Sequence, residues 1–130
     1  LAQANIGVFL GIEPNGGTTS SLSKANVYSA SGAAMSVASG RLSFTLGLIG
    51  PCFSIDTACA STLAAMHVAS ISLRDGECPS ALCMGTKFLT EISNLATSIA
   101  GMTSARGRCH TFDERADGYV RGEGCGAFLL

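Results

Sequence analysis

A strand-like run that passes directly into a segment of small residues is the feature that most constrains this chain. Residues 52–57 are rich in β-branched and apolar side chains, and the small residues of 58–65 follow without a loop. Such a junction predicts a strand that turns at once into a helix. The thiol of Cys59 would then lie at the helix N-terminus, where unpaired N–H groups and the helix dipole favour an anion. Because a thiolate is such an anion, this junction is the candidate site of chemistry.

Strand-like and helix-like runs alternate along the whole chain. The runs expected to form strands are residues 6–11, 52–57, 81–85 and 125–130. The segments expected to form helices are residues 27–44, 60–74 and 91–100, and those expected to form loops are residues 13–23 and 104–123. This alternation predicts an α/β architecture in which helices cover both faces of a sheet.

Two of the expected helices are built from small residues. In and just after residues 27–44, small and apolar residues recur every four positions, which predicts one continuous helix with a stripe along one face. The stripe consists of Ala34, Ala38, Leu42 and Leu46. Residues 60–74 are small or apolar on nearly every face, which predicts a helix that is buried on all sides. The pair Asp75 and Gly76 is expected to end that helix, because glycine is preferred just past a helix C-terminus.

The composition indicates one domain of low surface charge. Of the 130 residues 47% are hydrophobic and only 13% are charged, which suits a piece of a larger domain. We expect residues 1–130 to be one partial domain, truncated at both ends, because the chain starts without a methionine and ends in an apolar run. The net charge of −1 and the absence of a basic run disfavour nucleic-acid and polybasic membrane binding. The sequence has no uninterrupted stretch of 18 or more apolar residues, so no membrane span is predicted.

The six cysteines raise the alternatives of a disulfide framework and a zinc site. They lie at positions 52, 59, 78, 83, 109 and 125, with no Cys-x-x-Cys pair, and both histidines are isolated in the sequence. Reduced thiols of a cytoplasmic protein are therefore favoured over disulfides, and no metal site is expected. Cys52 and Cys83 lie in apolar runs and are expected to be small core residues.

Several sequence blocks resemble one known family. Residues 56–61 read Asp-Thr-Ala-Cys-Ala-Ser, which resembles the active-site motif of the β-ketoacyl synthases, specifically the ketosynthase domains of type I polyketide synthases. The resemblance continues in the same order through residues 6–11, 40–43, 72–77, 107–113 and 116–126. The two histidine motifs of the family, His-Gly-Thr and Asn-x-Gly-His, do not occur among these residues.

The resemblance implies the thiolase-like fold, in which helix and sheet layers alternate as αβαβα. The chain would cover most of the N-terminal half of that fold. In the family the strand that leads to the cysteine pairs with its copy across a two-fold axis. Residues 52–57 are therefore expected to be the strand of a homodimer interface.

The resemblance also implies an acyltransferase mechanism. Cys59 would be the nucleophile that takes an acyl group from a phosphopantetheine thiol and carries it as a thioester, with its backbone N–H as an oxyanion donor. A malonyl-type extender on an acyl carrier protein would then lose CO₂, and its enolate would attack that thioester in a Claisen condensation. No directly bound cofactor and no metal are implied. Residues 1–130 alone are expected to be inactive, because the family's two catalytic histidines lie elsewhere.

Three alternatives to a polyketide-forming enzyme stay open. A non-elongating ketosynthase would only transfer or hold acyl chains, and a ketosynthase of fatty-acid synthesis would use the same cysteine. A cysteine hydrolase would need a base near the thiol, and nothing in the sequence supplies one. The absence of a Gly-x-Ser-x-Gly motif disfavours an α/β-hydrolase.

The remaining polar residues are interpreted as structural. His67 is expected to be a packed, hydrogen-bonded residue of its helix, and His110 a solvated loop residue. The carboxylates Asp113, Asp117 and Glu123 lack the spacing of a calcium site, and the glycine pattern at 122–126 lacks the helix that a phosphate site requires. In the family this loop shapes the active-site floor through buried ion pairs, for which the candidate partners are Arg115 and Arg121.

The sequence departs from the family pattern at a few positions. Ala60 and Thr62 stand where serines are usual, and Gly85-Thr86 stands where two glycines are usual. Residues 103–106 replace a usual Leu-Ser-Pro-Asp. These departures concern the subgroup and the acyl preference.

Overall fold

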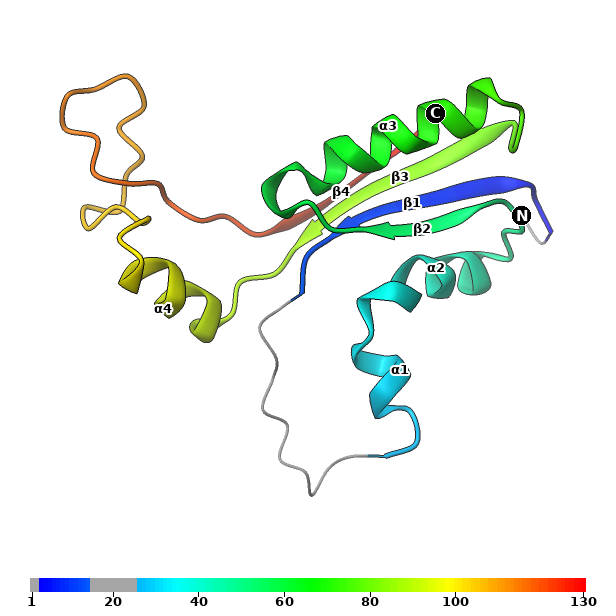
Figure 1. The fold of residues 1–130 in the computed structure, drawn as a ribbon, viewed down its shortest axis with the longest axis horizontal. Helices are drawn as coiled ribbons and strands as arrows, with labels where there is room; N and C mark the ends of the chain where they lie inside the picture. Colours follow the sequence, from blue (N-terminus) through cyan, green and yellow to red (C-terminus); the bar gives the residue numbers. More distant parts are fainter. Residues whose placement is uncertain (1–2, 15–25) are drawn as a thin grey trace. The chain divides into compact units, whose positions relative to one another are not determined.

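The computed structural model describes residues 3–14 and 26–130. These residues form two compact units, which are described separately (Figure 1). The sheet unit comprises residues 3–14, 26–86 and 125–130. The loop unit comprises residues 87–124. The loop expected at 13–23 falls largely outside the described residues.

A four-stranded sheet forms the centre of the sheet unit. Its strands are β1 (Ile6–Ile12), β2 (Cys52–Ile55), β3 (Ser80–Lys87) and β4 (Gly124–Leu129), in the order β2-β1-β3-β4. β1 runs parallel to both of its neighbours. Ala81 and Leu130 exchange both N–H···O bonds, which is the pattern of an antiparallel pair. The sheet is therefore mixed, with all four strands where the apolar runs predicted them.

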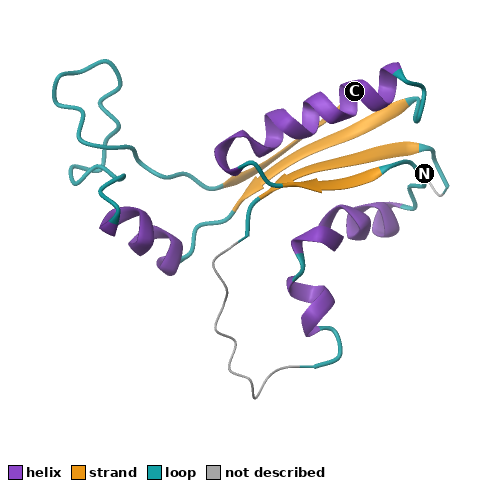
Figure 2. Cartoon of the chain, viewed as in Figure 1, coloured by secondary structure: helices purple, strands orange, loops and turns teal. Residues whose placement is uncertain are grey.

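Helices lie on both faces of this sheet, as the alternation of elements predicted (Figure 2). On one face, α3 (Ser61–Arg74) packs against a cluster of fully or nearly fully buried residues, namely Phe9, Ala65, Ala69, Cys78, Ala81 and Cys83. On the other face lies α2 (Ala38–Leu46), whose Ser39 N–H donates to the Ser54 hydroxyl at 3.1 Å. Ser54 stands opposite Leu10 in the register, so the even residues of β1 face α2 and the odd ones face α3.

The prediction that residues 60–74 are buried on all sides is wrong for the described residues. α3 buries a single face, on which Ala65 and Ala69 are 0% exposed. Leu63 is 70% exposed and Ile71 is 39% exposed on its other faces. The sequence carries apolar residues all round this helix, whereas the sheet can cover only the side where alanines allow close approach.

The helix expected at 27–44 is not continuous. It is replaced by α1 (Ser29–Ala33), a 3₁₀ turn at Met35–Val37, and α2, with Ala34 in an extended conformation at ψ 116°. The predicted stripe is also wrong, because α2 buries Ser39 and Ser43 while Leu46 is 40% exposed. The N–H of Ser39 finds its acceptor on β2, so α2 begins afresh at the sheet, and a repeat of small residues cannot signal this.

The two cysteines expected in the core have different surroundings. Cys83 on β3 is 0% exposed, and burial raises the pKa of its thiol. Cys52 is exposed, which contradicts the prediction for it. The reason is the strand order, since β2 lies at the edge of the sheet and β3 does not. All six cysteines are free thiols in the structure.

Helix ends follow the sequence signals. α3 ends at Asp75 as its C-cap, and Gly76 takes the left-handed conformation at φ 74°. In the loop unit, α4 (Glu91–Ile99) begins with a capping box between Thr90 and Ser93. Residues 104–123 follow as the predicted long loop. Within the described ranges, no helix has the length and apolar character needed to cross a bilayer.

Candidate functional site

The turn that carries Cys59 connects the end of β2 to the start of α3. β2 ends at Ile55, the 3₁₀ turn Ala58–Ala60 follows, and α3 begins at Ser61. Ala58 adopts a left-handed conformation at φ 54°, which is uncommon for a residue with a side chain. The Cys59 side chain that follows is exposed. The strand-to-helix junction predicted from the sequence is therefore present, and it presents the thiol to the surroundings.

A hydrogen-bonded clamp around Ser61 holds this turn. The buried Ser61 hydroxyl donates to the Ala58 carbonyl oxygen at 2.6 Å and accepts the Thr57 N–H at 2.9 Å. The Asp56 carboxylate accepts the Ala58 N–H at 2.9 Å. These bonds stabilise the left-handed residue just before the thiol. The role of Ser61 was not predicted from the sequence, because its hydroxyl bonds backward to Thr57 and Ala58 and does not cap α3.

The position of Cys59 suits a nucleophile. Its N–H belongs to the turn that opens α3, where N–H groups have no acceptor within the helix. The 14-residue α3 directs the positive end of its dipole at this turn, and the start of a helix favours negative charge on a group bound there. No hydrogen bond joins the thiol to a histidine or a carboxylate among the described residues. The turn thus presents an exposed thiol and an N–H group at a helix start, with no histidine or carboxylate of the described residues hydrogen-bonded to that thiol.

His67 does not have the surroundings predicted for it. It lies on the outer face of α3, its side chain is exposed, and no side chain in the described ranges donates or accepts a hydrogen bond with it. The prediction of a packed, hydrogen-bonded histidine is therefore wrong for the described residues. With its neighbours on that face it lines an open apolar hollow, whose lining residues are Thr57, Ala60, Leu63, Ala64, Met66, His67 and Ser70. This hollow includes residues on both sides of Cys59 in the sequence.

Two glycines let the start of α3 lie close against the sheet. A Cβ atom on Gly11 would lie 2.5 Å from the Thr62 nitrogen, and one on Gly85 would collide with the Thr62 hydroxyl oxygen. Gly11 and Gly85 are partners in the β1–β3 register. Gly85 matches a glycine that is usual in the family, and its contact with the start of α3 could not be predicted from the sequence.

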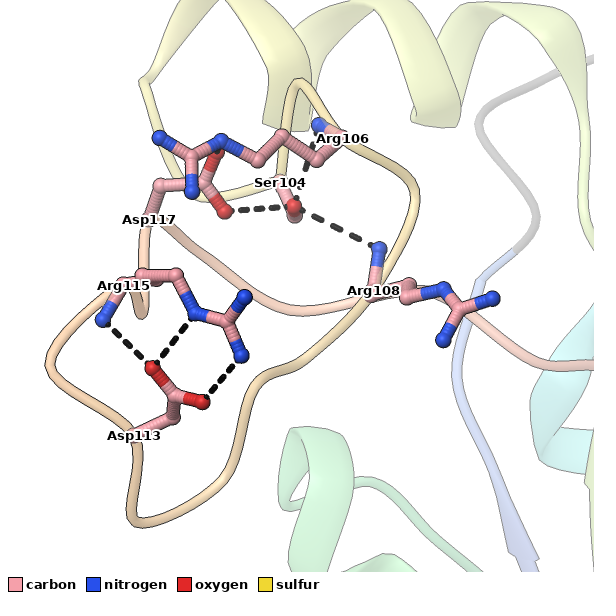
Figure 3. Close-up of polar contacts among 6 residues, drawn as sticks. All are labelled: Ser104, Arg106, Arg108, Asp113, Arg115 and Asp117. Atoms are coloured by element: carbon pink, nitrogen blue, oxygen red, sulfur yellow. Dashed lines mark hydrogen bonds and ion pairs between the residues drawn. The ribbon is translucent and has the colours of Figure 1, made fainter.

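In the loop unit, Asp113 and Arg115 form a two-pronged ion pair (Figure 3). Arg115 donates from Nε to Asp113 Oδ1 at 2.9 Å and from Nη2 to Oδ2 at 2.7 Å. These bonds lower the pKa of the Asp113 carboxyl and raise that of the Arg115 guanidinium. Arg115 was predicted to pair with a carboxylate of this loop, and it does. The pair is exposed, so the expectation of a buried ion pair is wrong.

Ser104 organises a second set of contacts in the same loop (Figure 3). Its hydroxyl donates to Asp117 Oδ1 at 2.5 Å and accepts the N–H groups of Arg106 and Arg108 at 3.2 and 3.4 Å. The bond from Ser104 is the largest cause that lowers the pKa of the Asp117 carboxyl. Arg106 adds a contact to Asp117 at 3.8 Å between Nε and Oδ2. These exposed contacts connect residues 104–108 of the loop with Asp117.

The other predicted residues of the loop make contacts with backbone and hydroxyl groups. The Glu123 carboxylate accepts the Leu89 N–H at 3.1 Å, and Arg121 donates to the Thr97 hydroxyl at 3.3 Å. His110 lies in the loop, as predicted, with a positive φ of 48°, and it is half-buried where a solvated side chain was expected. No group of three metal-ligating side chains occurs within the described ranges.

Comparisons with known proteins match this chain along its whole length. A family model described as "Beta-ketoacyl synthase, N-terminal domain" matches residues 1–130. A mycocerosic acid synthase-like polyketide synthase of Mycolicibacterium smegmatis is 44% identical over 134 residues, which cover 100% of this chain and 6% of that protein. The 3-methylorcinaldehyde synthase of Phoma sp. is 40% identical over 136 residues, which cover 100% of this chain and 5% of that protein. The chain thus spans a small part of these relatives.

Solved structures of ketosynthase domains are also similar to this chain. The ketosynthase from module 6 of the bacillaene synthase of Bacillus subtilis superposes with a TM-score of 0.81 at 36% identity, over 99% of this chain and 22% of that one. The oxazolomycin ketosynthase domain of Streptomyces albus superposes with a TM-score of 0.77 at 29% identity, over 96% of this chain and 22% of that one.

Proposed function

This chain belongs to the family of β-ketoacyl synthase N-terminal domains and has their thiolase-like α/β fold, and from this premise we propose that it supplies the acyl-accepting cysteine of a polyketide ketosynthase. Cys59 is the proposed nucleophile. The observation that carries the proposal is the exposed Cys59 thiol in the turn that opens α3, directly after the left-handed Ala58. A helix N-terminus favours the thiolate form that acyl transfer requires.

The proposed first step is a thioester exchange. The Cys59 sulfur attacks the carbonyl carbon of an acyl chain held on phosphopantetheine, and the negative charge moves to the carbonyl oxygen. The Cys59 N–H stabilises that oxyanion, because its donor direction is free at the start of the helix. The carbon–sulfur bond to phosphopantetheine then breaks, and the carrier thiolate leaves and takes up a proton. The product is an acyl thioester on Cys59.

The second step is the decarboxylative condensation. A malonyl-type extender on the acyl carrier protein releases CO₂, and the carbanion that remains as an enolate attacks the Cys59 thioester. The bond between the acyl carbon and the Cys59 sulfur breaks, so the thiolate is regenerated and the carrier holds a β-ketoacyl chain. The described residues place no base beside the thiol, so the groups that assist decarboxylation belong to other parts of the protein.

The partners of this reaction follow from its chemistry. The acyl and extender chains are carried by the phosphopantetheine of an acyl carrier protein, and no other cofactor takes part. The reaction belongs in the cytoplasm, where thiols stay reduced. β2 is an edge strand of the sheet, and this supports the proposal that it pairs with its copy in a homodimer.

Acyl loading of the full-length protein tests the proposal. The protein is incubated with an acyl phosphopantetheine thioester, and the bound acyl group is measured by mass spectrometry. Cys59→Ala should abolish loading, whereas Cys52→Ala and Cys109→Ala, which change two other exposed thiols, should load like the wild type. A Cys59→Ala protein that still loads and extends chains would refute the proposal.

The same experiment addresses the non-elongating alternative. When malonyl-loaded carrier protein is added, a condensing enzyme releases CO₂ and forms a β-ketoacyl product. Loading on Cys59 without release of CO₂ would identify a protein that only transfers or holds acyl chains.

A further inference from the structure

The first turn of α3 rests directly on two glycines of the sheet. Gly11 of β1 and Gly85 of β3 are paired in the register, and both lie beneath Thr62. A Cβ atom on Gly11 would lie 2.5 Å from the Thr62 nitrogen and 2.6 Å from the Ser61 carbonyl carbon. A Cβ atom on Gly85 would collide with the Thr62 hydroxyl oxygen and lie 2.9 Å from its Cγ2. The helix start therefore touches the sheet on both strands.

The two contacts are of different kinds. Gly11 faces backbone atoms of the helix, which cannot be changed by substitution, whereas Gly85 faces the side chain of Thr62. A methyl group at either position would push the first turn of α3 away from the sheet. At position 85 the push depends on the size of residue 62, while at position 11 it does not.

Any such displacement would reach the nucleophile through the Ser61 clamp. Ser61 precedes Thr62, and its hydroxyl holds both the Thr57 N–H and the Ala58 carbonyl oxygen. In the sequence, Cys59 lies between the two residues that bond to Ser61 and Thr62, which contacts the sheet. A shift of Thr62 therefore moves the turn that aims the Cys59 thiol and its N–H.

We propose that Gly11 and Gly85 are positioning residues: the space that they leave for Thr62 sets the location of the Cys59 thiol and oxyanion donor relative to the bound thioester, an inference that rests on the proposed function of Cys59. Their role is to fix how closely the helix start approaches the sheet. A misplacement of about 1 Å can lower a reaction rate by about 10²-fold.

Gly85→Ala in the full-length protein is the first test. Its rate of acyl loading from an acyl phosphopantetheine thioester should fall by about 10- to 100-fold. Alkylation of Cys59 by iodoacetamide should keep its wild-type rate, because displacement of iodide needs no oxyanion donor. Peptide mapping of the buried Cys78 and Cys83 reports unfolding, and these thiols should stay unmodified. A general loss of structure would instead expose them.

Rescue separates positioning from general damage. Adding Thr62→Ala to Gly85→Ala removes the colliding hydroxyl and methyl groups and leaves an approach of 3.0 Å to the Thr62 Cβ, so most of the loading rate should return. The same Thr62→Ala change should not rescue Gly11→Ala, whose added methyl meets backbone. Gly40→Ala is the control, because a Cβ atom on Gly40 has nothing within 4 Å.

The outcomes are distinct from those for the proposed function. If Gly85→Ala loads like the wild type while Cys59→Ala does not load, the positioning proposal fails and the nucleophile stands. If Gly85→Ala does not accumulate, the double variant decides: an active double variant supports the proposal, and an inactive or unfolded one overturns it. Equal rescue of Gly11→Ala by Thr62→Ala would also overturn it. Loading by Cys59→Ala would overturn the proposed function itself.

Discussion

The sheet unit and the loop unit of this chain are stabilised in different ways. In the sheet unit, Val8, Phe9 and Cys83 are 0% exposed, and the first turn of α3 lies against Gly11 of β1 with its backbone and against Gly85 of β3 with the Thr62 side chain. In the loop unit, no residue from 87 to 124 reaches full burial. Its order depends on side-chain hydrogen bonds around Ser104 and on the pair of Asp113 and Arg115.

This difference identifies the part of the chain that can hold a reactive group in place. Burial and close packing fix a backbone turn to within a fraction of an ångström, because displaced side chains lose many contacts at once. Exposed hydrogen bonds and ion pairs are individually weak and compete with water. Cys59 belongs to the sheet unit, and Ser61, which bonds to its turn, is buried. The loop unit is expected to adapt to whatever it contacts.

Truncation of one aromatic ring in each unit should give the largest contrast. Phe9 is 0% exposed and stacks on Phe53 with ring centroids 5.7 Å apart, so Phe9→Ala should cost about 3–5 kcal/mol of local stability. Phe112 is fully exposed at 106%, so Phe112→Ala should change stability by less than about 0.5 kcal/mol. Hydrogen exchange of the β1, α3 and loop amides in the full-length protein measures both. Similar costs for the two variants would remove the distinction between the units.

Two serines that each organise a turn should give a smaller contrast. Ser61→Ala removes two part-buried hydrogen bonds, with the Thr57 N–H and the Ala58 carbonyl, of about 0.5–1.5 kcal/mol each, so it should cost about 1–3 kcal/mol and slow acyl loading. Ser104→Ala removes comparable bonds at an exposed site, and water can replace them, so it should cost less than about 1 kcal/mol. Exchange rates at the start of α3 and in residues 104–117 compare the two. A costlier change at Ser104 would contradict the account.

The smallest expected effect is the pH dependence of the Asp113 contact. The bonds from Arg115 hold the pKa of this carboxyl below its ordinary value of 3.8, so the pair stabilises the loop above that value. The stabilisation is lost as the pH falls through the lowered pKa. The loop amides of the Asp113→Asn variant should therefore exchange faster than those of the wild type at pH 7. Well below about pH 3 the two proteins should exchange at the same rate. A difference that persists in acid would show that the charge is not its cause.

Much of this architecture could be predicted from the sequence, and the failures have physical reasons. The runs that became β1, β3 and α3 are continuous apolar or small-residue segments, so their positions could be predicted, although the buried face of α3 could not. α2 begins beside a hydrogen bond between Ser39 and Ser54, 15 residues apart in the sequence, and a local stripe cannot reveal such a contact. Cys52 and Cys83 lie in similar apolar runs, and only the strand order separates the exposed thiol from the buried one.

Cys59 stays a prediction, made from its position at a strand-to-helix junction and from the resemblance of residues 56–61 to the family's active-site motif. The contacts that support its turn could not be predicted. Ser61 bonds to the turn before α3, and Gly11 and Gly85 contact the start of α3 from two strands. These contacts join elements that are distant in the sequence, so they are seen only in the structure. The expected surroundings of His67 were wrong because an apolar pattern does not tell which face of a helix the sheet covers.

The central claim is that Cys59 becomes acylated. The most direct measurement incubates the full-length wild-type protein with an acyl phosphopantetheine thioester, quenches in acid, digests the protein and maps the acyl mass to a peptide. The account predicts that the acyl group is on Cys59 and on no other cysteine of this chain. An adduct on Cys52, Cys109 or Cys125 with Cys59 unmodified, or no adduct at all, would contradict it.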